Sequence, residues 1–412
     1  MIDLNFIRKN IEQAKKLILR KEPTFEFDKL MDLDSKITSL KHKIEELRKD
    51  RNEISKKAAS GLTDELRNKS IEIGKQIKEA EENLKSIEEE FTNLALSCPN
   101  IPQEDIPEGG KESNKPIKTI GKKTEFKFTP KNHIELNEIN DWFDFKSAIQ
   151  MSGSNFALYK PNGVKIIYAL TSLMTRNNVK HSYQPIIPPY LVNEQALVNS
   201  GNLPKFRGDF YEMPKDDLCL IPTAEVSLTN MHANQILNEK ELPKRYTSWT
   251  SCFRREAGSY GSEERGLIRI HQFEKVELYS VCKPEESNNE LEKMLECAED
   301  ILGKLGLYYQ VSLLATQDCS FASSKTYDIE VWLPGQNRFY EVSSCSNCTD
   351  FQTRRAKIRY RKDGKKVELV HTLNGSSLAL PRLMVALMEQ YQQEDGTIKL
   401  PKALQEEVDN VW

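Results

Sequence analysis

The chain has 412 residues, with 59 Lys and Arg against 62 Asp and Glu and a formal net charge of -3. This length exceeds a usual single domain, so we expect two domains. The charge excludes a wholly basic nucleic-acid binder but not a local basic surface, because binding depends on where the cations lie. The sequence lacks an N-terminal apolar signal and any run of about 18 apolar residues, which predicts a cytoplasmic protein without a membrane partner.

The cysteines argue against both a disulfide framework and a structural zinc site. Eight cysteines are spread along the chain, so reduced thiols are expected. Only Cys345 and Cys348 form a CxxC pair. A zinc site needs a second pair of ligands at suitable spacing, and Cys345 falls in a predicted strand, so we expect no structural zinc.

The first predicted element is a long antiparallel helical hairpin, an arm at about residues 27–97. Apolar residues recur there at spacings of three and four, the pattern of a heptad seam. The first seam is Leu30, Leu33, Ile37, Leu40, Ile44, Leu47, Arg51 and Ile54, and the second is Leu66, Ser70, Ile73, Ile77, Ala80, Leu84, Ile87, Phe91 and Leu94. A turn near Ser60 and Gly61 brings the seams into register, with Arg51 opposite Ser70. Each helix would be about 45 Å long.

The end of this arm nearest its turn carries an excess of positive charge. Between Lys41 and Lys78 there are eleven Lys and Arg against seven Asp and Glu, whereas the base of the second helix is acidic. Such a patch is most often only a solvated face, but it also suits contacts to RNA phosphates. The candidate RNA-binding residues are Arg48, Lys49, Arg51, Lys56, Lys57, Arg67 and Lys69.

Residues 101–116 are rich in Pro, Gly and charge and predict a linker between an N-terminal domain (1–100) and a C-terminal domain (117–412). Beyond it, short β-branched strands alternate with helices predicted at 163–175, 288–305 and 380–392. Hairpin-type connections favour an antiparallel sheet flanked by helices, so the fold class is α+β. Neither GxGxxG nor GxxxxGK[ST] occurs, so a nucleotide would be held in another way.

Residues 250–277 predict two antiparallel strands joined by a long polar loop whose turn residues start at Ala257. The first strand is expected to run through Glu256, and the second to alternate from Ile268 through Ile270. Arg254 at a strand end can offer its planar fork to a phosphate, and Glu256, two residues on, faces the same way to accept from an exocyclic amine. Taken alone, such a segment is more often a solvated hairpin.

This segment resembles motif 2 of the class II aminoacyl-tRNA synthetases, and its sequence FRREAGSYG followed by RGLIRIHQFEKVE is similar to the seryl-tRNA synthetase family. The sequences IPTAEVSL, EVSSCSN and HTLNGSSLALPR occur in the family's order around it. The segment HSYQPIIPPYLVN resembles motif 1, with Pro188 near the family's dimer-interface proline. The resemblance implies a class II catalytic domain, a homodimer, and an arm that holds the long variable arm of serine tRNAs.

The resemblance also implies roles for individual residues. ATP as substrate would contact Arg254, Arg255, Glu256, Ile270, Phe273, Glu341, Val342, Ser343, Ser344 and Arg382, of which Arg254, Glu341 and Arg382 are the expected catalytic residues. Serine would contact Thr223, Ala224, Glu225, Glu277 and Ser376, with Ser376 favoured over Ser377. Mg²⁺ would be coordinated by Glu341 and Ser344, since it prefers hard oxygen ligands. His271 is expected to be structural.

The implied reaction is ATP-dependent activation of L-serine and its transfer to the 3′ end of tRNA(Ser), with tRNA(Sec) as a possible second acceptor. Two rivals stay open: a ligase that loads a carrier protein, and an inactive relative that serves as a coiled-coil interaction protein. The arm argues against the first, and the complete set of ionic site residues argues against the second. The chain departs from the family pattern at Pro161–Val164, where Gly-Asp-Gly-Ala is common, and at Pro381, where Gly is common.

Overall fold

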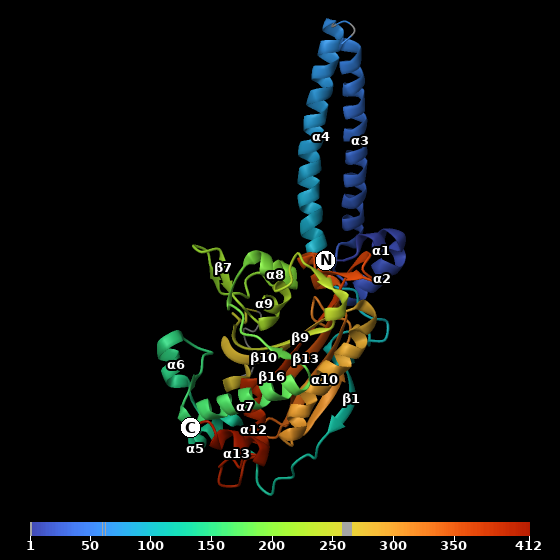
Figure 1. Ribbon diagram of the computed structural model, residues 1–412. Helices are drawn as coiled ribbons and strands as arrows, with labels where there is room; N and C mark the ends of the chain where they lie inside the picture. The colour runs from blue at the N-terminus through green and yellow to red at the C-terminus, as the bar shows by residue number, and fades with distance from the viewer. Residues whose placement is uncertain (1, 60, 62, 258–265) are drawn as a thin grey trace. The chain divides into compact units, whose positions relative to one another are not determined.

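The computed structural model describes residues 2–59, 61, 63–257 and 266–412, which form two compact units, Ile2–Cys98 and Pro99–Trp412 (Figure 1). The N-terminal unit is entirely helical. Its helices are α1 Leu4–Lys9, α2 Ile11–Lys21, α3 Phe27–Ala59 and α4 Asp64–Leu96. In the described part of the chain no helix is long and apolar enough to span a membrane.

Helices α3 and α4 form the predicted antiparallel hairpin, drawn in blue in Figure 1. Ile54, Ile73 and Ile77 form one buried cluster between them, with Leu47 and Leu66 packed against it. Among the described residues, three ion pairs cross the hairpin: Lys29–Glu90 at 2.9 Å, Lys41–Glu88 at 2.8 Å and Arg48–Glu81 at 2.7 Å. In each pair a residue nearer the start of α3 meets one nearer the end of α4, as an antiparallel hairpin requires.

Two details of the predicted arm need comment. Ser60, where we expected the turn, lies outside the described residues. Arg51 occupies a seam position, but its side chain is exposed, because a long cationic side chain can extend to water from the edge of a seam. Helix α4 begins after the N-cap Thr63, whose Oγ1 accepts from the Leu66 N–H at 3.3 Å.

The C-terminal unit is built on an eight-stranded sheet, which confirms the predicted α+β class with an antiparallel sheet. All neighbours are antiparallel except the last pair, β9 and β4. In spatial order the strands are β1 Lys115–Ile120, β11 Tyr309–Leu313, β12 Lys325–Leu333, β13 Arg338–Thr349, β16 His371–Ala379, β10 Gln272–Cys282, β9 Lys244–Phe253 and β4 Gln184–Pro185.

Helices and small sheets surround the main sheet. The helices are α5 His133–Asn140, α6 Phe145–Ser152, α7 Pro161–Lys180, α8 Glu194–Ser200, α9 Ala224–Asn230, α10 Ser287–Lys304, α11 Phe351–Ala356, α12 Leu380–Gln390 and α13 Lys402–Asp409. The small sheets join β2 Phe143–Asp144 to β3 Leu158–Tyr159, β5 Leu191–Asn193 and β6 Glu212–Met213 to β7 Leu218–Leu220, and β8 Ile236–Asn238 and β15 Lys366–Leu369 to β14 Arg359–Lys362. Short 3-10 turns lie at Lys111–Ser113, Glu239–Glu241, Gly266–Ile268 and Pro284–Glu286.

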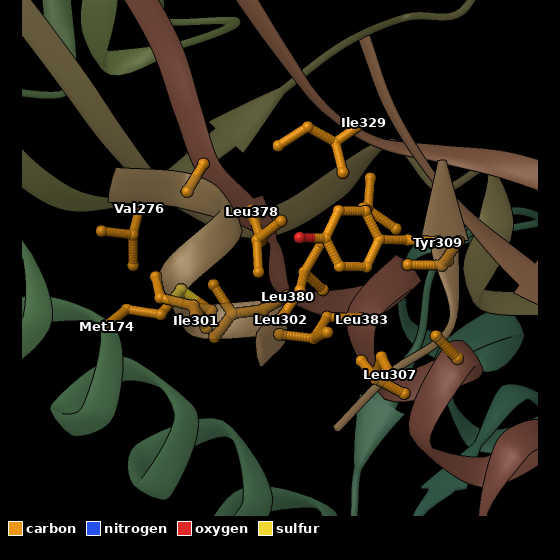
Figure 2. Packing of buried hydrophobic residues seen from close by; sticks show 14 of the residues in the cluster. Met174, Val276, Ile301, Leu302, Leu307, Tyr309, Ile329, Leu378, Leu380 and Leu383 are labelled. Carbon is orange, nitrogen blue, oxygen red and sulfur yellow. The ribbon is translucent and has the colours of Figure 1, made fainter. Parts of the chain in front are cut away.

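Strand β10 shows how the two faces of the sheet differ. Val276 and Leu278 point into the main core, where α7, α10 and α12 cover the sheet (Figure 2). Figure 2 shows Met174, Val276 and Ile301 converging from a helix, a strand and a second helix. Tyr279 belongs to a second cluster, which α9 and α11 contribute to. Because side chains alternate along a strand, Lys275 and Glu277 share the face of Tyr279.

The predicted linker 101–116 lies within the C-terminal unit. The Gln103 N–H donates to the Ser324 carbonyl at 2.9 Å, the Thr316 N–H donates to the Pro107 carbonyl at 2.9 Å, and β1 starts at Lys115. The Pro- and Gly-rich composition indicated irregular backbone correctly. It could not show that this backbone hydrogen-bonds to residues some 200 positions away.

The two departures from the family pattern have a common structural setting. Pro161 and Pro381 each lie in the first turn of a helix, α7 and α12 respectively. Proline suits this position because its fixed φ is helical and its missing N–H would have no partner within the helix.

Candidate active site

The strands of residues 250–277 pair as predicted, but their ends differ from the prediction. β9 ends at Phe253 and β10 begins at Gln272, so Arg254 and Glu256 follow the strand. Glu256 has φ +52°, and Ile268 lies in a 3-10 turn, so neither continues a strand alternation. The predicted turn residues 258–262 lie outside the described residues. The alternation in sequence therefore extended the strands by a few residues too far at each end.

A cavity opens beside these strand ends. It brings together segments from β9, β10, β13, β16 and α12 that are far apart in sequence. Its described lining residues are Arg254, Glu256, Leu267, Ile268, Arg269, Ile270, Phe273, Lys275, Glu341, Val342, Ser376, Ala379, Pro381 and Arg382. Eight of the predicted ATP- and serine-binding residues thus share one cavity, which is the candidate active site.

Arg254 and Phe273 lie together at one wall of the cavity. The Arg254 guanidinium carbon is 5.3 Å from the Phe273 ring centroid, within cation–π range, and its Nε donates to the Pro222 carbonyl at 3.3 Å. His271 Nδ1 is 3.0 Å from the Arg254 carbonyl oxygen, which holds the backbone of Arg254 in place. This contact agrees with a structural part for His271.

Glu256 is paired with a cation that the sequence did not single out. Arg269 Nη2 lies 2.8 Å from Glu256 Oε2, and both residues line the cavity. The pair thus connects a residue that follows β9 with one that precedes β10. Little in the sequence marks Arg269 as a site residue. It stands between Ile268 and Ile270, which are predicted to alternate along a strand, so Arg269 would be expected on the opposite face of that strand.

Arg382 enters the cavity from the first turn of α12, as predicted. Its Nη1 donates to the Glu341 carbonyl at 3.0 Å and lies 3.3 Å from the Glu341 carboxylate. Its guanidinium carbon is 5.1 Å from the Tyr340 ring centroid. A cation at a helix N-terminus is unfavourable beside the positive end of the macrodipole, and the Glu341 carboxylate offsets that effect here.

A β-bulge explains why Glu341 and Ser344 can act together. Residues three apart on a regular strand point to opposite faces. In β13, however, Ser343 pairs with Ile329 and Glu341 pairs with Glu330, so Val342 is an extra residue. The bulge turns Glu341 to the face of Ser344.

Ser344 itself pairs with Asp328 of β12, so this face carries several oxygen ligands. They line a second cavity, which shares Glu341, Arg269 and Arg382 with the first. Burial, and then the negative charge of Glu341, raise the pKa of Asp328 well above its usual value. Such a site favours a cation.

These residues fit Mg²⁺. Among the described residues no group of three or more His, Cys, Asp or Glu is arranged to hold a metal ion. Mg²⁺ usually keeps several waters and takes one or two carboxylates from the protein, so Glu341 with Ser344 is a suitable donor set.

Glu277 and Ser376 meet on adjacent strands. They pair directly between β10 and β16, because a bulge makes Ser377 an extra residue. Ser376 lines the cavity, whereas Ser377 is fully buried elsewhere and donates to Asn178 Oδ1 at 2.9 Å. The geometry therefore places Ser376, and not Ser377, beside Glu277.

Lys275 connects Glu277 to Thr223 and to the cavity. Its Nζ donates to Thr223 Oγ1 at 2.7 Å and is ion-paired with Glu277, and Thr223 Oγ1 donates to Glu277 Oε2 at 3.0 Å. Lys275 and Glu277 are 6% and 1% exposed. Lys275 was not among the predicted site residues, although its position two residues before Glu277 on one strand indicates a shared face.

Glu225 lies at the start of α9, where its Oε1 accepts from Gln352 Nε2 at 2.6 Å and from Asn374 Nδ2 at 3.0 Å. Burial, and then the neighbouring Glu277 carboxylate, raise the pKa of Glu225 to about 7. The group formed by Thr223, Glu225, Lys275 and Glu277 thus has two carboxylates around one lysine. An additional cation bound there would be stabilised.

The remaining predicted residues lie apart from the main cavity in the described part of the chain. Ala224 is buried in α9, and Ser343 donates to the Ser376 carbonyl behind the cavity wall. Arg255 is exposed, 5.9 Å from the Tyr211 ring centroid. Cys345 and Cys348 are free thiols buried in β13. The candidate RNA-binding residues all belong to the N-terminal unit.

Comparisons with known proteins agree with this geometry. The family model described as "tRNA synthetase class II core domain (G, H, P, S and T)" matches residues 209–391, and that described as "Seryl-tRNA synthetase N-terminal domain" matches residues 1–102. The serine–tRNA ligase of Syntrophobacter fumaroxidans is 45% identical over 420 residues, covering 100% of this chain and 99% of that protein. The serine–tRNA ligase of Desulfotalea psychrophila is 45% identical over 423 residues, with 100% of both chains covered.

Solved structures show the same fold. A crystal structure of seryl-tRNA synthetase from Pyrococcus horikoshii, complexed with ATP, has a TM-score of 0.93 and 35% identity over 99% of this chain and 98% of that one. The cytoplasmic serine–tRNA ligase of Naegleria fowleri, in complex with AMP, has a TM-score of 0.81 and 27% identity over 93% of this chain and 90% of that one. The chain therefore belongs to the seryl-tRNA synthetase family, the serine–tRNA ligases among the class II aminoacyl-tRNA synthetases.

Proposed function

We propose that the chain activates L-serine with ATP to seryl-adenylate and then transfers serine to the 3′ end of tRNA(Ser). The observation that carries this proposal is the arrangement of Glu277 opposite Ser376, with Lys275 leading from them into a cavity that also holds Arg254 and Arg382. A buried polar pocket thus adjoins a cationic cavity. This is what joining a small hydroxylated amino acid to a nucleotide requires.

The cavity suits ATP in its residue types. Phe273 offers a ring face for adenine, and Ile270 gives an apolar wall. Glu256 accepts a hydrogen bond from the adenine amino group. When adenine binds, this bond replaces part of the contact between Glu256 and Arg269. Arg254 and Arg382 bind phosphates through their planar forks, and Arg255 stands at the exposed rim. Val342 and Ser343 support the strand that carries Glu341 and Ser344.

Glu341 and Ser344 hold Mg²⁺ in this proposal. The bound ion would neutralise negative charge on the phosphates of ATP, a role for which few protein ligands suffice. The support is the bulge at Val342, which turns both side chains to one face, and the neighbouring Asp328, whose pKa is raised by burial and then by the negative charge of Glu341.

Serine selectivity follows from polar groups that need a partner. Glu277 and Ser376 contact the serine hydroxyl, while Thr223 and Glu225 bind its α-ammonium group, with the Ala224 backbone between them. Alanine would leave the buried Glu277 and the half-buried Ser376 without that partner, which costs more than a missing apolar contact. The walls of the pocket exclude the additional methyl group of threonine. Such steric exclusion discriminates less strongly than an unpaired buried polar group does.

In the first step an oxygen of the serine carboxylate attacks the α-phosphorus of ATP, the bond to the β-phosphate oxygen breaks, and pyrophosphate leaves. Negative charge grows on the phosphoryl oxygens, where Arg254 stabilises it. In the second step a terminal ribose hydroxyl of the tRNA attacks the carbonyl carbon of seryl-adenylate, and AMP leaves. Positioning and electrostatics suffice for both steps.

No covalent intermediate on the protein is needed. Burial raises the pKa of the Cys252 thiol and of the Cys345 thiol, which keeps both protonated and poorly nucleophilic. His271 is engaged by the Arg254 carbonyl.

We further propose that residues 1–100 form a tRNA-binding domain, whose arm contacts the long variable arm of tRNA(Ser), with tRNA(Sec) as a second candidate for the same contact. Residues 117–412 form the catalytic domain in this proposal. The support is the exposed basic stretch of α3 and α4, which includes Lys49, Lys56, Lys57 and Arg67. The relatives named as serine–tRNA ligases also match over this region. A cytoplasmic location is proposed because the Naegleria fowleri relative is described as cytoplasmic.

A homodimer completes the proposal. Pro188 of the segment that resembles motif 1 is buried, and the neighbouring Ile187 is 83% exposed, which suits an apolar contact with a second copy. Size-exclusion chromatography with light scattering tests this part, and a monomer at micromolar concentration would contradict it.

Two assays test the catalytic proposal together. Serine-dependent exchange of pyrophosphate into ATP reports the first step, and charging of total tRNA with labelled serine reports both. We expect activity in each. Exchange without charging would favour a ligase that loads a carrier protein, and the absence of exchange would favour an inactive relative.

A further inference from the structure

His133 and Leu267 are 134 positions apart in sequence but share a buried hydrogen bond. His133, the first residue of α5, is 2% exposed, and its Nε2 accepts from the Leu267 N–H at 3.3 Å. Because Nε2 accepts, the ring proton is on Nδ1, which lies 3.4 Å from Glu389 Oε1 of α12. The imidazole therefore connects α12 to the 3-10 turn at Gly266–Ile268.

Glu389 is in turn firmly held. It is fully buried, and its carboxylate accepts from the His133 N–H at 3.2 Å, the Gly335 N–H at 3.0 Å and Gln336 Nε2 at 3.0 Å. A carboxylate with several donors fixes its own orientation, and its bond to the His133 N–H holds the backbone from which the imidazole projects. The acceptor that Leu267 meets is therefore preorganised.

The close approach of the turn to His133 depends on glycine. Gly266 has φ +72°, and a Cβ at this position would lie 2.1 Å from His133 Nε2. A side chain there is excluded both by the backbone conformation and by the imidazole. The backbone of the turn thus packs directly against the imidazole ring of His133.

The residues that follow form one wall of the candidate active site. Leu267, Ile268, Arg269 and Ile270 all line the cavity. The Ile268 carbonyl faces Arg382 Nε at 3.5 Å, and Arg269 is paired with Glu256. A displacement at Leu267 would therefore move the groups that surround the nucleotide.

We propose that His133 is a positioning residue for ATP, which acts by holding the wall Leu267–Ile270 through the Leu267 N–H. It does not touch the substrate. The inference rests on the proposed function in assigning this wall to ATP, whereas the hydrogen bond to Leu267 can be tested without any activity.

The main test compares His133→Leu with Leu136→Ala. Leu136 lies on the same helix, is fully buried and has no polar side-chain atom that could accept from the Leu267 N–H, so its truncation controls for a general loss of packing. His133→Leu should raise the KM for ATP in pyrophosphate exchange about tenfold, as for one lost buried hydrogen bond. The KM for serine should stay within about twofold. Leu136→Ala should leave both KM values near those of the native protein. Equal KM values for ATP in the two variants would overturn the proposal.

Amide hydrogen exchange provides the readout that is independent of activity. In His133→Leu a peptide covering residues 266–270 should exchange faster, while peptides of β10 stay protected as in the native protein. His133→Gln, whose amide oxygen can accept from Leu267, should restore protection in part. Unchanged exchange at 266–270 in His133→Leu would refute the positioning role even if the native protein proved inactive.

A double-mutant cycle with Gly266→Ala covers the case that His133→Leu folds poorly. Alone, Gly266→Ala should raise the KM for ATP, because its Cβ displaces the turn from the imidazole. Combined with His133→Ala, which leaves space for that Cβ, the Gly266→Ala change should have a clearly smaller effect on the KM for ATP. Additive effects of the two substitutions would contradict a direct contact as the cause.

Discussion

Glu277 of β10 and Ser376 of β16 are direct cross-strand partners, and the β-bulge at Ser377 is what puts them in register. Without the extra residue, Ser377 would oppose Glu277. Instead Ser377 is buried against Asn178, and Ser376 faces the cavity. One inserted residue thus decides which of two adjacent serines can contact a substrate beside Glu277.

Glu277→Ala should lower serine-dependent pyrophosphate exchange at least tenfold, because it removes the carboxylate proposed to contact the serine hydroxyl and leaves Lys275 without its ion pair. Ser376→Ala should also raise the KM for serine. Ser377→Ala is the matched control, since it changes a neighbouring hydroxyl that points away from the cavity, and it should leave the KM for serine within about twofold. Unaltered pyrophosphate exchange in Glu277→Ala would contradict a role of Glu277 in serine binding.

The KM for serine should fall as pH rises through about 7. Burial and Glu277 raise the pKa of Glu225 to about 7, so this carboxyl is partly protonated at neutral pH. The α-ammonium group of serine favours the ionised form, so binding improves above that pKa and weakens below it. At pH 6 the KM should be about tenfold above its high-pH limit. Glu225→Gln should raise the KM at every pH and remove this dependence, and a native KM that is flat between pH 6 and pH 8 would contradict the assignment.

Charge reversal near the tip of the arm should affect tRNA without affecting adenylate formation. Lys56→Glu with Lys57→Glu alters two exposed cations near the end of α3. The KM for tRNA should rise about tenfold or more at low salt, with a smaller effect at high salt, while pyrophosphate exchange stays unchanged. Lys29→Glu with Lys36→Glu is the control, because it makes the same charge change at the base of the same helix. Equal effects of the two pairs on the KM for tRNA would argue against contact near the tip.

Ile77→Ala should destabilise the arm by about 2 kcal/mol, because this side chain is 6% exposed within the α3–α4 seam. Hydrogen exchange of α3 and α4 peptides should accelerate, and pyrophosphate exchange should persist. Ile71→Ala removes the same atoms from a side chain of α4 that is 51% exposed and should leave exchange of these peptides nearly unchanged. If both variants behaved alike, the heptad seam would not be the contact that stabilises the arm.

The helical hairpin could be predicted from sequence because heptad spacing is a local signal that repeats over many turns. The antiparallel sheet could be predicted in kind, since hairpin-type connections leave few alternatives. Strand ends were less predictable: Glu256 and Ile268 fit an alternation but lie outside the strands. Their conformation depends on contacts such as the Arg269–Glu256 pair, which the local pattern does not contain.

The roles of single residues depended most on tertiary structure. The sequence by itself determined the residue types of the candidate site and their order, including Arg254, Glu277, Glu341 and Arg382. Only the folded chain decided that bulges at Val342 and Ser377 turn Glu341 and Ser376 into the site, and that Lys275 and His133 support it. The physical reason is that side-chain direction on a strand follows from pairing with its neighbours, and those neighbours are brought together by packing over long separations.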